Sequence, residues 1–206
     1  MEGVSRISAV IFDLGGVIVP LDFPRGYAAL GRLSACGPEE MRERIAATGL
    51  VERLERGQVQ PEAFARVICR SLGIDVAFEE FCELWGSIFP PETLVAEDLL
   101  ESIAGQCRLL LLSNTNGIHF PYIQRNYGLL RHFHDFVLSY RVGVMKPAPE
   151  IYLEALKRAG CPPGECFFTD DLESNVAAAR ELGLVAVRFE NEAQIREDLR
   201  ARGLSV

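Results

Sequence analysis

The chain has 206 residues, of which 49% are hydrophobic and 24% are charged, and its formal net charge is 21 − 29 = −8. This length suits one domain, with or without a small insertion, and the composition excludes a disordered chain, a coiled coil and a collagen-like repeat. Binding to nucleic-acid phosphates needs clustered Lys and Arg. Because the sequence has no such cluster, nucleic acid is not an expected partner.

A membrane span is not expected either. The longest apolar runs, such as Leu109–Leu112 and Ala9–Phe12, are far shorter than the ~20 residues needed to cross a bilayer. The first residues include Glu2 and Arg6 and lead directly into a strand-like segment, without the succession of parts that marks a signal peptide. We therefore expect a cytoplasmic protein, whose oligomeric state the sequence does not indicate.

Five short segments are nearly continuous in apolar and β-branched residues, which is typical of strands buried on both faces. They are Ile7–Phe12, Cys107–Leu112, Phe136–Ser139, Cys166–Thr169 and Leu184–Phe189. Helices are predicted among the last four, at Pro149–Ala159 and Glu173–Leu182, each followed by a glycine that suits a helix end. This alternation predicts an α/β fold with a Rossmann-like parallel sheet covered by helices on both faces.

The interval between Phe12 and Cys107 breaks the alternation, because it shows helical patterns and no convincing strand. The helical segments are Pro38–Thr48, Val51–Arg56, Pro61–Leu72, Phe78–Phe89 and Glu92–Ala104. We therefore predict a helical cap over residues 20–92, inserted into an α/β core made of residues 1–19 and 93–206.

Polar residues follow the strands, at the edge where open parallel sheets bind their ligands. In chain order they are Asp13-Leu14-Gly15-Gly16, Ser113-Asn114-Thr115-Asn116, Lys146-Pro147 and Asp170-Asp171. Three carboxylates side by side need a counter-charge, which a cation such as Mg²⁺ supplies. The glycine amides, a hydroxyl and a lysine suit a phosphoryl group. The set predicts metal-assisted phosphoryl transfer with a carboxylate available as nucleophile.

Each motif taken alone also has an ordinary structural explanation. The Asp-x-Gly-Gly segment is compatible with a simple turn, Ser113–Asn116 with a polar turn and helix cap, and Lys146-Pro147 with a surface loop. Asp170-Asp171 would also suit the start of a helix, where carboxylates complement the helix dipole. Only their joint occurrence, in this order and at the predicted strand ends, favours the functional interpretation.

The same motifs resemble the four motifs of the haloacid dehalogenase superfamily of hydrolases, most of which are Mg²⁺-dependent phosphatases. The matching stretches are Ile11–Val17, Leu111–Asn114, Gly143–Pro147 and Phe167–Asn175. The 113 − 13 = 100 residues between the first two motifs leave room for the helical cap of that superfamily. The Ser-Asn-Thr-Asn and Phe-Phe-x-Asp-Asp sequences within these motifs are shared with the α-D-glucose-1-phosphate phosphatase group and the phosphatase domain of epoxide hydrolases. The resemblance therefore implies small phosphorylated metabolites as substrates, with sugar phosphates favoured.

The resemblance also implies roles for the acidic residues. Asp13 attacks phosphorus and forms an aspartyl-phosphate, which water then hydrolyses. Mg²⁺ is held by Asp13, Asp171 and the carbonyl of Gly15, with Asp170 beside or behind them.

For the phosphoryl group, the implied ligands lie in three motifs. Ser113 and the amide of Asn114 bind phosphoryl oxygens, and the amides of Gly15 and Gly16 face the same group. Lys146 neutralises charge on the nucleophile and on the phosphoryl group.

One position departs from the superfamily pattern. Most of its phosphatases carry a second Asp two residues after the nucleophile as general acid and base, whereas this chain has Gly15. Such a group contributes about 10²–10⁴ in rate, so we expect a preference for easy leaving groups, as in anomeric sugar, acyl or aryl phosphates. His119 and Asp22 are the candidate substitutes, with a packing role as the alternative for His119.

Two other hypotheses remain open. In a haloacid dehalogenase, Asp13 would attack carbon and no metal would be needed. In a weakly catalytic regulator, the same residues would bind a phosphometabolite with little turnover. The cap contacts are also open, since Trp85 and Phe89 suit either a core or a substrate site, and Glu55 suits either solvent or the site.

Overall fold

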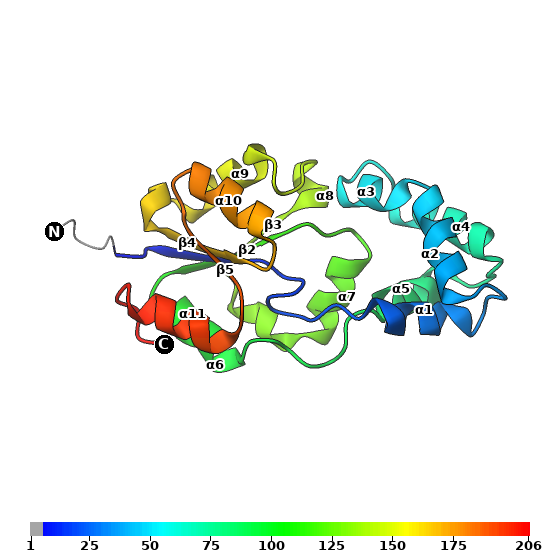
Figure 1. Ribbon diagram of the computed structural model, residues 1–206, viewed down its shortest axis with the longest axis horizontal. Helices are drawn as coiled ribbons and strands as arrows, with labels where there is room; N and C mark the ends of the chain where they lie inside the picture. Colours follow the sequence, from blue (N-terminus) through cyan, green and yellow to red (C-terminus); the bar gives the residue numbers. More distant parts are fainter. Residues whose placement is uncertain (1–5) are drawn as a thin grey trace.

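The computed structural model describes residues 6–206 (Figure 1). In that part of the chain a parallel five-stranded sheet has the order β3-β2-β1-β4-β5. Its strands are β1 (Ala9–Phe12), β2 (Arg108–Ser113), β3 (Asp135–Leu138), β4 (Cys166–Asp170) and β5 (Val185–Arg188). The predicted α/β fold with a Rossmann-like parallel sheet is confirmed, and β1 is its central strand.

The sheet is covered on both faces, and alternate residues of β1 enter different hydrophobic cores. Val10 and Phe12 belong to one core, while Ala9 and Ile11 belong to the other. The first core includes residues of α6 (Glu97–Ala104), α7 (His119–Asn126) and α11 (Glu192–Arg200), and the second includes residues of α9 (Pro149–Ala159) and α10 (Glu173–Glu181). Figure 1 shows α9 and α10 on one side of the sheet and α6 and α11 on the other. This double burial explains why the strands are almost uniformly apolar.

Five helices between β1 and α6 form a group with its own core, beyond one end of the sheet (Figure 1). They are α1 (Phe23–Gly31), α2 (Pro38–Ala47), α3 (Leu50–Glu55), α4 (Pro61–Leu72) and α5 (Phe78–Gly86). Leu54, Phe64 and Phe81 are buried where these helices meet. This grouping agrees with the expected cap, whose limits at residues 20 and 92 stay a prediction.

Some helix limits differ from the sequence prediction. The α5 helix ends at Gly86 rather than Phe89, and a Cβ at Gly86 would lie 2.4 Å from the Tyr122 ring, so α5 packs tightly on α7 there. The α6 helix begins at Glu97 rather than Glu92, because the Leu94 amide donates to the Ile18 carbonyl instead of a helical one. Helices α1, α7 and α11 were not predicted.

Short helical turns complete the connections. They are η1 (Gly128–His132), α8 (Ser139–Val142) and η2 (Pro163–Glu165). Among residues 6–206, every helix is too short or too polar to cross a bilayer.

Candidate active site

The ends of neighbouring strands bring three carboxylates together. Asp13 follows β1, Asp170 is the last residue of β4 and Asp171 comes next, and one oxygen from each lies within 4.8 Å of the others. The Asp13 amide donates to the Thr169 carbonyl at 2.9 Å, which fixes the relative position of the two strand ends. Strand β4 runs one residue beyond its predicted end at Thr169, so Asp170 lies in the sheet itself.

Lys146 is the positive group of the cluster. Its Nζ lies 2.7 Å from Asp13 Oδ1 and 2.6 Å from Asp170 Oδ2, and it donates to the Leu112 carbonyl at 3.0 Å. Burial disfavours the charged form, but the two carboxylates outweigh burial and raise the pKa of Lys146. The buried lysine is therefore a fixed ammonium ion that faces the nucleophile predicted from the sequence.

Asp170 is already saturated with donors. Besides Lys146, it accepts hydrogen bonds from the Leu172 amide at 2.9 Å and from Asn175 Nδ2 at 2.9 and 3.0 Å. Its position behind the other two acids agrees with the role that the resemblance implied. Asn175 lies inside the fourth motif and its side chain is buried, but its contact with Asp170 was not predicted from the sequence.

The other two acids are less fully neutralised, since Asp13 shares Lys146 with Asp170. Burial raises the pKa of Asp13 despite the opposing effect of Lys146, and burial together with Asp170 raises the pKa of Asp171. At Gly16, where φ is +78°, a Cβ atom would lie only 2.6 Å from Asp171 Oδ2, so the chain passes very close to this carboxylate. Hard oxygen donors that are only partly neutralised fit a small divalent cation. Of the three acids, Asp13 and Asp171 are the two that are not saturated with donors, so the metal site expected from the sequence would use them, with the Gly15 carbonyl remaining a prediction.

The residues expected to bind phosphate lie at the same edge. Ser113, at the end of β2, is buried and lines the cavity next to Asp13. The side chain of Asn114 bonds to both backbone groups of Lys146, donating to its carbonyl at 2.9 Å and accepting from its amide at 2.8 Å. The Asn114 side chain therefore holds the lysine loop in place. Phosphate binding by the Asn114 backbone amide stays a prediction.

The two candidate acids have different surroundings. Asp22 is the N-cap of α1, where its carboxylate accepts from the Arg25 amide at 2.9 Å. His119 is half-buried and lines the cavity, with its ring stacked on Trp85 and edge-on to Phe89, and burial lowers its pKa to about 4. At neutral pH His119 is uncharged, so these contacts favour the packing role over that of a proton donor.

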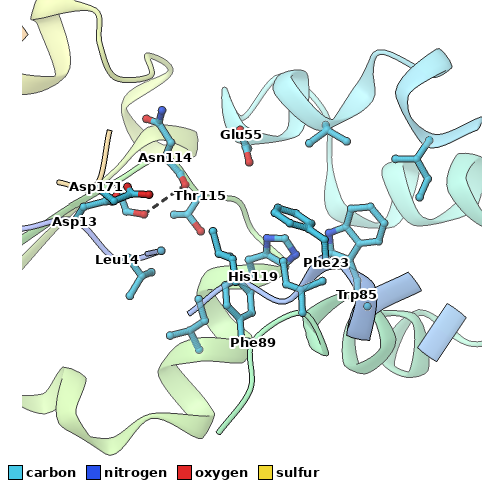
Figure 2. A pocket seen from close by; sticks show the side chains of 18 of the residues that line it. Asp13, Leu14, Phe23, Glu55, Trp85, Phe89, Asn114, Thr115, His119 and Asp171 are labelled. Carbon is cyan, nitrogen blue, oxygen red and sulfur yellow. Dashed lines mark hydrogen bonds between the residues drawn. The ribbon is translucent and has the colours of Figure 1, made fainter. Parts of the chain in front are cut away.

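A cavity of about 600 Å³ separates the acidic cluster from the cap (Figure 2). Asp13 and Asp171 lie at one end, and Phe23, Trp85, Phe89 and His119 gather at the other. Trp85 also packs on Phe64 and Phe81 in the cap core, so it belongs to the core and to the cavity wall at once.

The position of Glu55 decides between solvent and the site, the two alternatives that the sequence left open. Glu55 lines the cavity, where burial, reinforced by Glu52, raises its pKa to about 7. It is the cap carboxyl that the sequence left undecided between solvent and the site.

Comparisons with known proteins agree with this geometry. The haloacid dehalogenase-like hydrolase family matches residues 7–183. The chain is 30% identical over 199 residues to D-ribitol-5-phosphate phosphatase of Bacteroides thetaiotaomicron, which covers 94% of this chain and 97% of that protein. A crystal structure of a HAD family enzyme from the same organism matches with a TM-score of 0.84 at 27% identity, covering 95% of this chain and 100% of that one. A complex of that enzyme with magnesium and inorganic phosphate matches with a TM-score of 0.81 at 29% identity, covering 90% and 95%. The chain belongs to the haloacid dehalogenase-like hydrolase family.

Proposed function

We propose that this protein is a Mg²⁺-dependent phosphatase of small phosphorylated metabolites. The observation that carries the proposal is the meeting of Asp13, Asp171 and Lys146 at one end of a cavity, with Asp170 buried behind them. The relative named as a phosphatase supports phosphate esters as substrates, and the related magnesium complex supports the choice of metal. Asp13 and Asp171 would hold the ion, which would neutralise charge on the phosphoryl oxygens.

The proposed reaction proceeds in two steps. An Asp13 oxygen forms a bond to phosphorus while the bond from phosphorus to the ester oxygen breaks, and the departing oxygen takes up a proton to become an alcohol. A water oxygen then attacks phosphorus, which releases inorganic phosphate, restores the Asp13 carboxylate and liberates one proton. Lys146 stays beside Asp13 and offsets the negative charge of the phosphoryl group throughout.

Two finer expectations belong to this proposal. Sugar and polyol phosphates are supported by the name of the relative, D-ribitol-5-phosphate phosphatase. Easy leaving groups are supported by Gly15, which lines the cavity where most of the superfamily has an acid.

Phosphate release from acetyl phosphate in the presence of Mg²⁺ tests the proposal. We expect the Asp13→Asn variant to lose at least about 10⁴-fold in turnover while keeping its fold, because it removes the nucleophile. Circular dichroism of the variant controls for folding. EDTA should abolish turnover, and added Mg²⁺ should restore it.

The same assays separate the two other hypotheses. A dehalogenase would release halide from haloacids in EDTA and would not respond to Mg²⁺. A regulator would bind phosphate esters with turnover that Asp13→Asn leaves unchanged, and this result would overturn the phosphatase proposal.

A further inference from the structure

The cavity wall opposite the acidic cluster is almost entirely apolar. It is formed by side chains of α1, α2, α3, α5 and α7, which include Leu30, Ile45, Val51, Leu84 and Ile123, and by Ile88, which follows α5. Leu30, Ile45 and Ile123 are buried in the protein interior. A ligand that extends from Asp13 towards the cap therefore meets hydrocarbon on several sides.

The cavity mouth is apolar as well. Within residues 6–206, seven large hydrophobic side chains are exposed, and three of them line this cavity: Leu21, Phe23 and Leu172. They come from both sides of the opening, since Leu172 follows Asp171 in the core whereas Phe23 begins α1 of the cap. An exposed apolar patch at a cavity indicates an apolar ligand, because such a surface is costly to leave in water.

The polar groups in the distant wall are few: they belong to Tyr27, Arg42, Glu55, Trp85 and His119. Arg42 is paired with Glu39 at 2.9 Å on the protein surface. Trp85 Nε1 and His119 Nε2 are buried atoms without a protein partner and without surface towards the cavity. The Glu55 carboxyl and the Tyr27 hydroxyl remain, which are fewer groups than the several donors and acceptors that a polyol requires when it leaves water.

We propose that the preferred substrates are monophosphates of apolar alcohols, such as alkyl, isoprenoid or aryl groups, rather than of polyols. This inference rests on the proposed phosphatase function. From the cavity lining it assigns a different substrate class from the polyol phosphate that the relative's name suggests. The phosphate would lie at Asp13 and Lys146, and the hydrocarbon would fill the space towards Trp85 and Phe89 (Figure 2).

A series of n-alkyl monophosphates tests the inference, because all its members share a primary leaving oxygen and differ only in buried surface. We expect kcat/KM to rise about fourfold for each added methylene until the chain fills the cavity. The matched polar substrate is a pentitol 5-phosphate, which has the carbon count and the primary ester of n-pentyl phosphate. A flat series, or a higher kcat/KM for the pentitol ester, would overturn the inference.

A matched pair of leucine variants locates the effect. Leu21 lines the cavity and is 42% exposed, while Leu33 lies away from it and is 44% exposed. Leu21→Gln should reduce the gain per methylene, whereas Leu33→Gln should keep the wild-type gain. Equal slopes in the two variants would count against a hydrocarbon site at this mouth.

Turnover of acetyl phosphate distinguishes failure of the proposed phosphatase function from failure of the proposed substrate class. Turnover of acetyl phosphate that is lost in Asp13→Asn, together with a flat alkyl series, would overturn the substrate class alone. No turnover of acetyl phosphate in Mg²⁺ would overturn the phosphatase function, and the substrate class with it.

Discussion

Asp13 has two opposing neighbours, a cationic Lys146 at 2.7 Å and the low-polarity interior that raises its pKa. A carboxyl group with a raised pKa stays protonated up to a higher pH. A cation that binds the carboxylate must displace this proton.

We therefore expect Mg²⁺ binding to release protons and to strengthen with increasing pH until Asp13 is ionised in the free protein. Isothermal titration calorimetry at one pH, in buffers of different ionisation enthalpy, measures the protons released. The Asp13→Asn variant, which has no proton to give at this position, should release fewer. A binding enthalpy that does not depend on the buffer would contradict the expectation.

His119 makes a prediction about stability. Its pKa is lowered to about 4 by burial, against 6.5 for the free group, so the unfolded chain binds the proton more tightly between these values. The free energy of unfolding should therefore fall as the pH decreases from 6.5 to 4, by ~3 kcal/mol from this residue.

Glu55 changes the stability in the opposite direction over much of the same range, because its folded pKa is the higher one. The comparison of wild type with His119→Gln in urea unfolding at several pH values isolates the histidine. If the difference between the two proteins stays constant from pH 7 to pH 4, His119 is not the neutral group described here.

The meeting of the site residues at one edge of the sheet was predictable from the sequence, but several of their interactions were not. The site residues lie at or after the ends of parallel strands, which place such residues at one edge of the sheet. They are Asp13, Ser113, Lys146, Asp170 and Asp171. The bond from Asn175 to Asp170 depends on how α10 packs on β4. No residue pattern predicts the distance between Asn175 and Asp170, and none predicts the burial of Glu55.

Contacts between helices decide how the cap meets the core. Gly57, just after α3, has a φ of +66°, and a Cβ there would lie 2.2 Å from the carbonyl oxygen of Tyr140 in α8. Gly49, just before α3, has a φ of +62° and open space around it. The two glycines share the backbone conformation that disfavours side chains, and only Gly57 touches the core.

We expect Gly57→Ala to raise KM about tenfold, which corresponds to ~1.4 kcal/mol, because the added methyl pushes α3 away from α8. Gly49→Ala should bear the backbone strain alone and keep KM near the wild-type value. Steady-state kinetics on one alkyl phosphate, with urea unfolding of both variants, checks this. Equal KM values would show that the contact has no part in substrate binding.

Burial also explains which helices and strands the sequence could predict. The strands were found because double burial makes them uniformly apolar, and α4 and α9 were found because proline and glycine mark their ends. In α1 and α11 no proline–glycine pair marks the two ends, and the apolar face shows only once a partner surface is known. The end of α5 at Gly86 depends on the Tyr122 ring, which is far away in the sequence.

The arrangement of cap and core also limits the size of a substrate. The cavity of about 600 Å³ lies between the acidic cluster and the cap, within the range of sites for small molecules. We expect free O-phosphotyrosine to be hydrolysed at least about 100-fold faster, in kcat/KM, than the same residue in a folded phosphoprotein. Phosphate release at matched concentrations measures this ratio. Comparable rates would mean that the cap does not restrict access.

The two connections between cap and core run next to each other. The Asp22 amide donates to the Ile88 carbonyl at 2.8 Å, and the Leu94 amide donates to the Ile18 carbonyl at 2.9 Å. The polypeptide thus leaves the sheet and returns to it at nearly one point, as in proteins that tolerate the insertion of whole domains. A foreign helical module grafted at this junction would leave the strand order intact, so selectivity and bond cleavage can diversify independently in this architecture.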